Sequence, residues 1–155
     1  MGRDLVIRQM AEEDLDAIVR TFAPWHKNKR QLQLYLRQQR RDERVVLVAL
    51  QGDAVVGYGT VVWQSLYKPF RQAGIPEIVD LNVMTEYQSQ GIGTALIAAA
   101  EHIAGGRGMR DIGISVEQSP GYAAANRLYP QLGYIPDGRG LDADDNELHL
   151  VKKLA

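Results

Sequence analysis

The ten residues YQSQGIGTAL, Tyr87 to Leu96, place two glycines one residue apart between a predicted strand and a predicted helix. The strand is the apolar run EIVDLNV, residues 77–83, which directly precedes this stretch. Glycines at such a junction leave backbone N–H groups uncovered and aim them, together with the helix dipole, at an anion. The stretch therefore predicts a phosphate-binding turn, and the question is which phosphate it binds.

The chain before this turn has the pattern of one strand, two helices and a β-hairpin. Apolar residues recur at helical spacing behind an acidic first turn, and Pro24 ends that helix. Two valine-rich runs flank a Gly-Asp turn, which is typical of a hairpin. The predicted elements are a strand over 5–10, helices over 11–22 and 28–41, and strands over 44–50 and 54–63. Residues 64–76 predict a loop, in which Tyr67 and Phe70 have no obvious core to join.

The chain after the turn alternates helices and strands. We expect helices over 93–104 and 122–133 and strands over 111–116, 134–136 and 147–154. The order β-α-α-β-β-β-α-β-α-β-β predicts an α/β fold. Its mixed, mostly antiparallel central sheet would have six to seven strands, flanked by about four helices on both faces. With 155 residues and no low-complexity linker, residues 1–155 are expected to form a single domain.

Composition excludes several classes of protein. Hydrophobic residues make up 45% of the chain, charged residues 24%, and the net charge is -1. These values are typical of a soluble globular protein, so no nucleic-acid partner is expected. The chain has no cysteine, which excludes disulfides, thiolate metal sites and a cysteine nucleophile. No signal core and no apolar run of about 18 residues is present, so we expect a cytoplasmic protein with no membrane partner.

Two common protein classes with glycine-rich turns do not fit this sequence. A P-loop needs a lysine before its Ser or Thr, and Gly93 is followed directly by Thr94. A dinucleotide-binding turn needs a small residue at its third glycine position, where this chain has Leu96. A nucleoside triphosphatase and a dinucleotide-dependent oxidoreductase are therefore disfavoured.

A third protein class with such a turn matches this sequence in more than one place. QSQGIG, which is Gln88-x-x-Gly91-x-Gly93, resembles the Gln/Arg-x-x-Gly-x-Gly/Ala signature of the GNAT superfamily of N-acetyltransferases. The strand before it, the helix after it and ANRLYPQLGY, residues 125–134, are similar to that family in order and spacing. The resemblance covers essentially the whole chain. It implies an acetyl-CoA N-acyltransferase-like fold with acetyl-CoA as the acetyl-donor cosubstrate.

The activity that the resemblance implies is transfer of the acetyl group to a primary amine, by direct attack in a ternary complex. The alternative is a non-catalytic acyl-CoA-binding sensor or interaction domain of the same fold. An amine of lysine type has a pKa of about 10.4, so a general base must remove a proton before attack. The carboxylates Glu77 and Asp80 lie three residues apart on the strand before the turn, and alternation predicts that they point to opposite faces.

The resemblance also assigns roles to individual residues. Glu77 is placed like the strand glutamate that serves as base in histone-type members, so we prefer it, with Asp80 or a water chain as alternatives. Tyr129 stands where the family places the tyrosine that protonates the thiolate. The family often has Asn seven residues earlier, where this chain has Tyr122. Either Asn126 substitutes for that Asn, or Tyr122 itself stacks on or hydrogen-bonds to the cofactor. Pro130 follows Tyr129 and predicts a kink in the helix.

The remaining cofactor contacts are implied to come from backbone groups. A bulge in the strand before the turn would expose the backbone of Leu81, Asn82 and Val83 to pantetheine. The turn itself would supply N–H groups to the pyrophosphate, from the residues Gln88, Ser89, Gln90, Gly91, Ile92, Gly93 and Thr94.

The acceptor is open between a small-molecule amine and a protein amine. Candidate contacts are Trp25, His26, Tyr35, Tyr67 and Phe70. Near the C-terminus, the acidic residues Asp137, Asp142, Asp144, Asp145 and Glu147 either attract a cationic amine or merely keep a hairpin solvated. The helix from Lys29 to Arg41 is basic, so the two charge signals disagree.

The sequence predicts no metal site. His26, His102 and His149 are far apart and show no metal-ligand spacing, and no acidic loop of calcium type occurs. Dimers are frequent among proteins of this resemblance, so a homodimer is among the partners that it allows.

Overall fold

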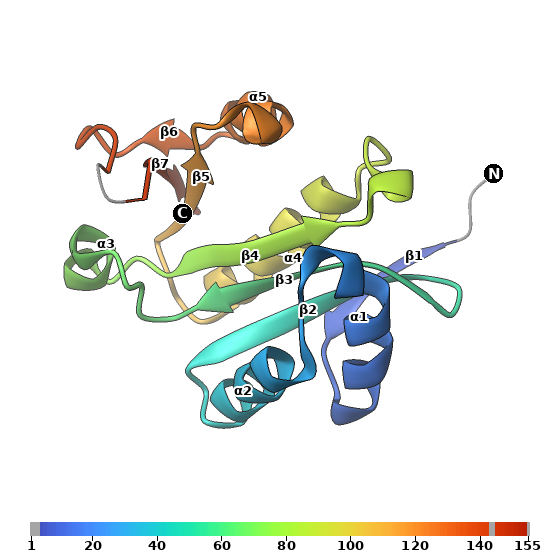
Figure 1. Ribbon diagram of the computed structural model, residues 1–155. Helices are drawn as coiled ribbons and strands as arrows, with labels where there is room; N and C mark the ends of the chain where they lie inside the picture. Colours follow the sequence, from blue (N-terminus) through green and yellow to red (C-terminus); the bar gives the residue numbers. More distant parts are fainter. Residues whose placement is uncertain (1–3, 143–144, 155) are drawn as a thin grey trace. The chain divides into compact units, whose positions relative to one another are not determined.

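The computed structural model describes residues 4–142 and 145–154, and this part of the chain forms a mixed α/β fold. Its seven-stranded, mostly antiparallel sheet has the strand order β1-β2-β3-β4-β5-β7-β6, which confirms the predicted fold class (Figure 1). The strands are β1 (Leu5–Gln9), β2 (Arg44–Gln51), β3 (Ala54–Val62), β4 (Glu77–Val83), β5 (Asp111–Glu117), β6 (Ile135–Pro136) and β7 (Glu147–Lys153). The α-helices are α1 (Leu15–Phe22), α2 (Lys29–Arg40), α3 (Lys68–Ala73), α4 (Ile92–Gly106) and α5 (Ala123–Gln131).

The chain divides into two compact units. Unit 1 comprises Met1–Val62 and Asp80–Ala100, and unit 2 comprises Trp63–Val79 and Glu101–Ala155. Strand β4 and helix α4 each begin in one unit and end in the other. The expectation of a single domain over residues 1–155 stays a prediction.

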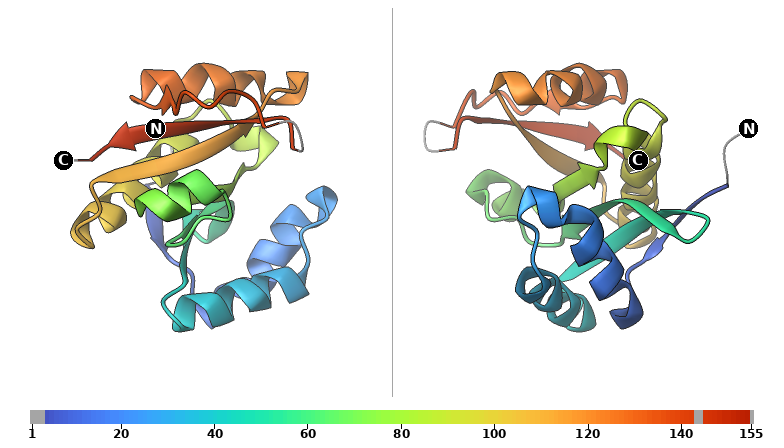
Figure 2. Two further views of the ribbon diagram at one scale, coloured as in Figure 1. Left: turned by 90° about the vertical axis from the view of Figure 1, so that its left-hand side faces the viewer. Right: turned by 45° about the vertical axis from the view of Figure 1, so that its right-hand side comes forward.

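Unit 1 is built on the predicted hairpin. Strands β2 and β3 pair antiparallel from Arg44↔Val62 onward, and β1 pairs antiparallel with β2. Helices α1 and α2 cover one face of these strands and the first half of α4 covers the other (Figures 1 and 2). The α1 and α2 side has a core that includes Ile18, Phe22, Leu32, Val46 and Tyr58.

Unit 2 combines the start of β4 with β5, β7 and β6. Strand β4 pairs parallel with β5, with Glu77 opposite Gly113. Strand β7 pairs antiparallel with both β5 and β6. Since directly opposed residues of paired strands share a face, Ser115 of β5 and His149 of β7 lie on the same face of this sheet. This pairing positions the polar cluster described below.

The prediction that residues 64–76 form a loop is wrong. The segment contains α3, which has Pro69 in its first turn and ends at Gly74 in the left-handed conformation. The helix has only six residues, too few to show a helical period in the sequence. The aromatic ring of Phe70, in this helix, is 2% exposed and packs against Gly113 of β5. Phe70 therefore joins a core formed by residues that are distant in the sequence.

Within residues 4–142 and 145–154, every helix falls short of the length and apolarity that a bilayer crossing requires.

The close approach of β4 and α4 to Gly57 of β3 in unit 1 generates a prediction. A Cβ added at Gly57 would lie 2.8 Å from the carbonyl oxygen of Asn82 and 3.3 Å from Leu96 Cδ1. Because a backbone oxygen cannot rotate away, Gly57→Ala should lower the free energy of unfolding by about 1–3 kcal/mol. Urea denaturation measures this loss.

The matched control is Gly105→Ala in α4, where an added Cβ meets nothing within 4 Å. It should leave stability unchanged or raise it by up to about 1 kcal/mol. Equal stability of the Gly57→Ala variant and the wild type would contradict the close approach.

Candidate functional site

Strand β4 is interrupted at Asp80, whose backbone is left-handed with φ of 55°. Such a conformation costs a non-glycine residue roughly 1–2 kcal/mol, and Asp and Asn tolerate it best because their short side chains bond locally. Here the Asn82 side chain donates to both the carbonyl oxygen and Oδ1 of Asp80, each at 2.9 Å. The expectation that Glu77 and Asp80 point to opposite faces assumed unbroken alternation, and Asp80 breaks that alternation.

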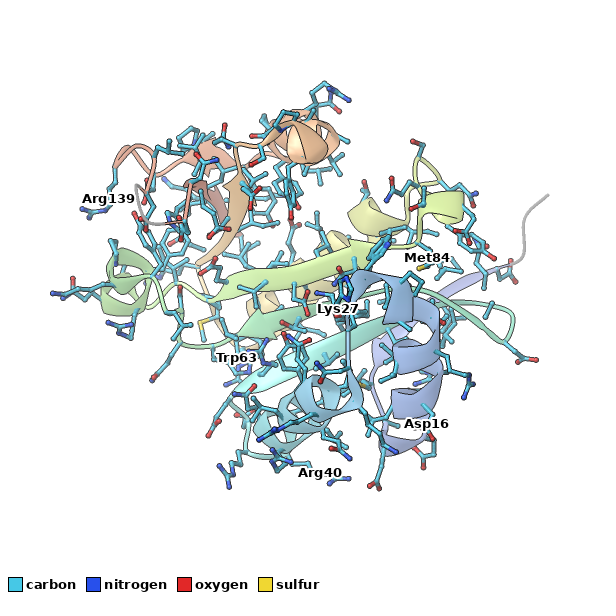
Figure 3. The ribbon with its side chains drawn as sticks, viewed as in Figure 1. Asp16, Lys27, Arg40, Trp63, Met84 and Arg139 are labelled. Atoms are coloured by element: carbon cyan, nitrogen blue, oxygen red, sulfur yellow. The ribbon has the colours of Figure 1, made fainter. Side chains whose placement is uncertain are left out.

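The Asp80 carboxylate is saturated with donors from unit 1. Lys27 Nζ lies 2.8 Å from Oδ1, and the hydroxyls of Tyr35 and Tyr58 donate to Oδ2 at 3.0 and 2.9 Å. Lys27 reaches this carboxylate from the segment between α1 and α2 (Figure 3). The carboxylate therefore has no oxygen without a donor.

The titration of this cluster follows from its donors. Burial alone would raise the pKa of Asp80, but hydrogen bonds from Asn82 and Lys27 outweigh it and hold the pKa below its ordinary value. Burial and the Asp80 charge raise the pKa of Tyr35 to about 12. A carboxylate so stabilised in its charged form is a weak proton acceptor, so the geometry favours a structural role for Asp80.

The glycine turn has the backbone of an anion site. Ser89 and Gly91 are left-handed, with φ of 68° and 82°. The Gln88 side chain donates to the Val83 carbonyl at 3.1 Å, so it ties the turn to the end of β4. An added Cβ at Gly91 would meet nothing within 4 Å, so packing does not require glycine there. The left-handed backbone conformation does, because glycine adopts it without strain.

Helix α4 starts directly at this turn. The Gly91 carbonyl accepts the N–H of Ala95 at 2.9 Å, so the N–H groups of Ile92, Gly93 and Thr94 precede the first helical hydrogen bond. An added Cβ at Gly93 would meet only Val83, at 3.8 Å. The three N–H groups can therefore receive a pyrophosphate at the helix N-terminus. The protein's own packing has room for a side chain at Gly93.

Glu77 lies at the centre of a buried polar cluster in unit 2. It is 5% exposed, and its two carboxylate oxygens accept the hydroxyls of Ser65 and Ser115, both at 2.5 Å. Ser115 Oγ also lies 2.7 Å from Nδ1 of His149. Because the Ser115 hydroxyl donates to Glu77, Nδ1 of His149 is the donor in the second bond. The lone pair of the neutral imidazole then lies on Nε2.

The imidazole of His149 is held by aromatic rings. Tyr67 stacks on it with ring centroids 3.5 Å apart, and Phe70 meets it edge-on. The Tyr67 hydroxyl donates to Asp137 at 2.7 Å, and burial followed by this bond raises the pKa of Tyr67 to about 12. Phe70 is therefore part of the core. Tyr67 is half-buried, and its predicted contact with the acceptor remains a proposal.

The other three predicted acceptor contacts belong to unit 1. Trp25 is half-buried and packs on Phe22 with ring centroids 5.2 Å apart. His26 is exposed and left-handed, and it ends the 3₁₀ turn Ala23–Trp25. Tyr35 is 8% exposed and is engaged with Asp80.

Helix α5 carries the predicted acid. Tyr129 is 7% exposed, and burial raises its pKa to about 12. Asn126 donates to the carbonyls of Glu117 and Tyr122, so its side chain fixes the turn between β5 and α5. Tyr122 is 48% exposed. Pro130 lies in the last turn of α5, and the helix still closes with a bond from Leu132 N–H to the Leu128 carbonyl.

The acidic residues near the C-terminus are crowded. Burial, then a hydrogen bond and the charge of Asp145, raise the pKa of Glu147 to about 7. Arg139, which is 64% exposed, lies 3.9 Å from Asp137 (Figure 3). Asp144 lies outside the described residues. The carboxylates of Asp142 and Asp145 come close to His149, a grouping that spacing among the three histidines could not reveal.

Sequence reasoning missed Ser65, Ser115 and Lys27. None of them belongs to a motif, and each finds its partner far along the chain. One signal was present for Ser115, since it is a polar residue between buried positions of an otherwise apolar strand. His149 carries a similar signal in β7, where it is a polar residue between Leu148 and Leu150.

The saturated Asp80 carboxylate generates a stability prediction. Asp80→Asn should lower the free energy of unfolding at neutral pH by about 3 kcal/mol, because it leaves Lys27, 20% exposed, without its counter-charge. The folded pKa of Asp80 is depressed, so its contribution is present above the unfolded pKa of about 3.9 and is lost as the pH falls through the folded value. Urea melts at several pH values measure both effects.

The control for this prediction is the double variant Lys27→Met with Asp80→Asn. It removes both charges and should recover part of the stability that Asp80→Asn loses. A single variant as stable as wild type at neutral pH would show that the pair contributes nothing.

Comparison with known proteins was made for sequence and for structure. Residues 9–134 match the model of the Acetyltransferase (GNAT) family. No curated protein matches the chain in sequence.

Solved structures similar to this chain include three acetyltransferases. PaiA N-acetyltransferase from Thermoplasma acidophilum, in complex with coenzyme A, has a TM-score of 0.76 at 18% identity, covering 97% of this chain and 99% of that one. Ribosomal-protein-alanine N-acetyltransferase from Brucella melitensis has a TM-score of 0.75 at 22% identity, covering 96% and 99%. Aminoglycoside 6′-N-acetyltransferase from Enterococcus faecium has a TM-score of 0.74 at 16% identity, covering 97% of each. At these identities the likeness shows a shared fold.

Proposed function

The chain belongs to the acetyltransferase (GNAT) family, and on that premise we propose that it moves the acetyl group of acetyl-CoA to a primary amine by direct attack in a ternary complex. The family match over residues 9–134 is the observation that carries the proposal. It includes the glycine turn, Glu77 and Tyr129. The complex of the similar PaiA N-acetyltransferase with coenzyme A supports the same donor.

The glycine turn would hold the donor. The N–H groups of Ile92, Gly93 and Thr94, which precede the first helical hydrogen bond, suit the two charges of a pyrophosphate, and the start of α4 adds its dipole. Leu81, Asn82 and Val83, which follow the left-handed Asp80, would offer backbone groups to the pantetheine arm. Ser89, Gln90 and Gly91 shape the turn, and Gln88 ties it to β4.

Glu77 is the better of the two candidate bases. Asp80 has four donors on its carboxylate and a depressed pKa, so taking a proton there would break an established network. Glu77 is bonded to two hydroxyls, and a hydroxyl can pass a proton on. The amine proton would reach Glu77 directly, through a serine hydroxyl, or through water. The new C–N bond then forms as the C–S bond breaks.

Tyr129 would serve the departing thiolate. Its pKa of about 12 keeps the phenol protonated at neutral pH. That value exceeds the thiol pKa of about 8.5, so complete transfer of the proton would be uphill by about 5 kcal/mol. Hydrogen-bond donation from Tyr129 to the sulfur is therefore the main contribution that we assign to it, with Tyr122 and Asn126 as further contacts of the donor.

The acceptor is proposed to be a primary amine of a small molecule or a protein. In unit 1, half-buried Trp25 and exposed His26 are candidate contacts, whereas Tyr35 is buried and engaged with Asp80. In unit 2, half-buried Tyr67 is the candidate contact. The carboxylates of unit 2 favour a cationic acceptor. The class of acceptor is identified by measuring coenzyme A release with a panel of amines that includes polyamines, aminoglycosides and lysine peptides.

The donor site is tested by Gly93→Ala. The added methyl group fits the protein but would occupy the approach of the pyrophosphate, so affinity for acetyl-CoA should fall by about tenfold or more, which corresponds to about 1.4 kcal/mol. Helical stability should be unchanged or higher. Titration calorimetry and thermal melting give the two readouts.

Gly105→Ala, in the same helix, is the matched control and should bind acetyl-CoA like the wild type. Stabilisation of the wild type by NAD but not by acetyl-CoA or coenzyme A would refute the proposed donor. Binding of acetyl-CoA without coenzyme A release for any amine would favour the alternative of a non-catalytic sensor.

The assigned chemistry is tested by two conservative variants. Glu77→Gln should lower kcat by about 10²–10⁴ because it removes the base. Tyr129→Phe should lower kcat by about 10² because it removes one hydrogen-bond donor from the thiolate. In both, the affinity for acetyl-CoA should change little, which separates these roles from donor binding.

Asp53→Asn, an exposed carboxylate in the turn between β2 and β3, is the control and should retain wild-type kcat. Wild-type turnover in both Glu77→Gln and Tyr129→Phe would overturn the roles while leaving the family assignment intact.

A further inference from the structure

We propose that Asp142, Asp145 and His149 of unit 2 form a binding site for one divalent transition-metal ion of the zinc class. One ligand atom from each residue lies within 4.8 Å of the other two. Asp142 and Asp145 belong to the segment between β6 and β7, and His149 belongs to β7 itself. The proposal does not rest on acetyl transfer, although Ser115 links His149 to Glu77, the proposed base.

The orphaned nitrogen of His149 is the observation that points to a ligand. His149 is 4% exposed, and its Nε2 is buried with no hydrogen-bond partner among the described residues. A buried polar atom without a partner loses the hydrogen bond that water would give it, at a cost of about 1–3 kcal/mol. Nε2 faces Asp142, whose Oδ2 lies 3.9 Å away. That distance is too long for a hydrogen bond but leaves room for an ion between the two atoms.

The other side of the imidazole has the support that metal-binding histidines have. A ligating histidine usually donates its second ring N–H to an acceptor that fixes the tautomer and raises the basicity of the ligand nitrogen. Here Nδ1 donates to Ser115 Oγ at 2.7 Å, and Ser115 in turn donates to the buried carboxylate of Glu77. The stacked ring of Tyr67 holds the imidazole plane. His149 is thus oriented with its Nε2 lone pair on the side of Asp142.

The donor set selects the type of ion. One imidazole nitrogen and two carboxylate oxygens suit zinc and its neighbours, whereas magnesium prefers oxygen ligands alone. Zinc holds such ligands at about 2.0–2.2 Å, so the three atoms would draw together by about 1 Å on binding. Asp145 is exposed and Asp142 half-buried, which provides the path from solvent. Three protein ligands leave a position for water.

The competing occupant of the same position is a proton. Protonation at Nε2 would give an ion pair with Asp142 at 3.9 Å and would need no metal. The two occupants differ in stoichiometric metal uptake and in their dependence on Asp145, because Asp145 takes no part in that ion pair.

The test is titration calorimetry of the full chain, freed of metal with a chelator, with Zn²⁺ and separately with Mg²⁺. We expect one Zn²⁺ per chain with saturable binding, and at least about tenfold weaker binding of Mg²⁺. Asp145→Asn should weaken Zn²⁺ binding by about tenfold or more without affecting folding, since this residue is exposed. Ser115→Ala should weaken it by about 10–100-fold although it removes no ligand.

His102→Gln is the matched control, because His102 is an exposed histidine of unit 2 that could bind Zn²⁺ adventitiously. It should leave the affinity unchanged. A Co²⁺-loaded sample should show visible absorption bands that Asp145→Asn changes and His102→Gln does not. The proposal is overturned by the lack of saturable Zn²⁺ uptake, or by uptake that depends on His102 and not on Asp145. Equal affinity for Mg²⁺ and Zn²⁺ would also overturn it, since the imidazole would then play no part.

Discussion

The left-handed backbone of Asp80 is the constraint on which the donor side of this protein depends. A non-glycine residue in that conformation inside a strand is held only because the surroundings stabilise it. Lys27, Tyr35, Tyr58 and Asn82 all direct donors at its carboxylate, and charge-assisted hydrogen bonds of this kind are about twice as strong as neutral ones. The residues that follow, Leu81 to Val83, lead directly into the glycine turn and the start of α4. A carboxylate that the spacing alone made a candidate base is better explained as the anchor of this irregularity.

Unit 2 contains the buried carboxylate of Glu77, and its environment differs in kind from that of half-buried Asp80. Glu77 is bonded only to hydroxyls, and the chain of bonds continues through Ser115 to an imidazole whose far nitrogen has no partner. Buried polar networks of this type are costly unless every member is satisfied. The proposed base and the proposed metal ligand are thus two ends of one network, linked by a single serine. An ion on His149 would strengthen the donation of Nδ1 to Ser115 and so influence the hydroxyl that faces Glu77.

Much of the fold was predictable because its signals are local. Alternation of apolar residues predicted the strands, helical spacing predicted four helices, and the Gly-Asp turn predicted the β2–β3 hairpin. Helix α3 was missed because six residues do not complete a period and because its buried ring, Phe70, packs against Gly113 of a later strand. The placement of Glu77 and Asp80 on opposite faces stays a prediction, since it assumed alternation, which holds only while every residue of a strand is extended, and Asp80 is left-handed.

By itself the sequence determined the order of the strands and of the four longer helices, the glycine turn and the family, because each depends on residues close together in the chain. The spacing of Gly91 and Gly93 expresses a local backbone requirement, and no distant residue is needed to read it. Only the tertiary structure decided which polar groups meet. Ser65, Glu77, Ser115 and His149 come from a loop and three strands, and their contacts follow from strand pairing and register. Lys27 likewise finds Asp80 across unit 1 through the packing of its helices on its strands. Such partners carry no mark in the sequence because long-range pairing, and not local preference, brings them together.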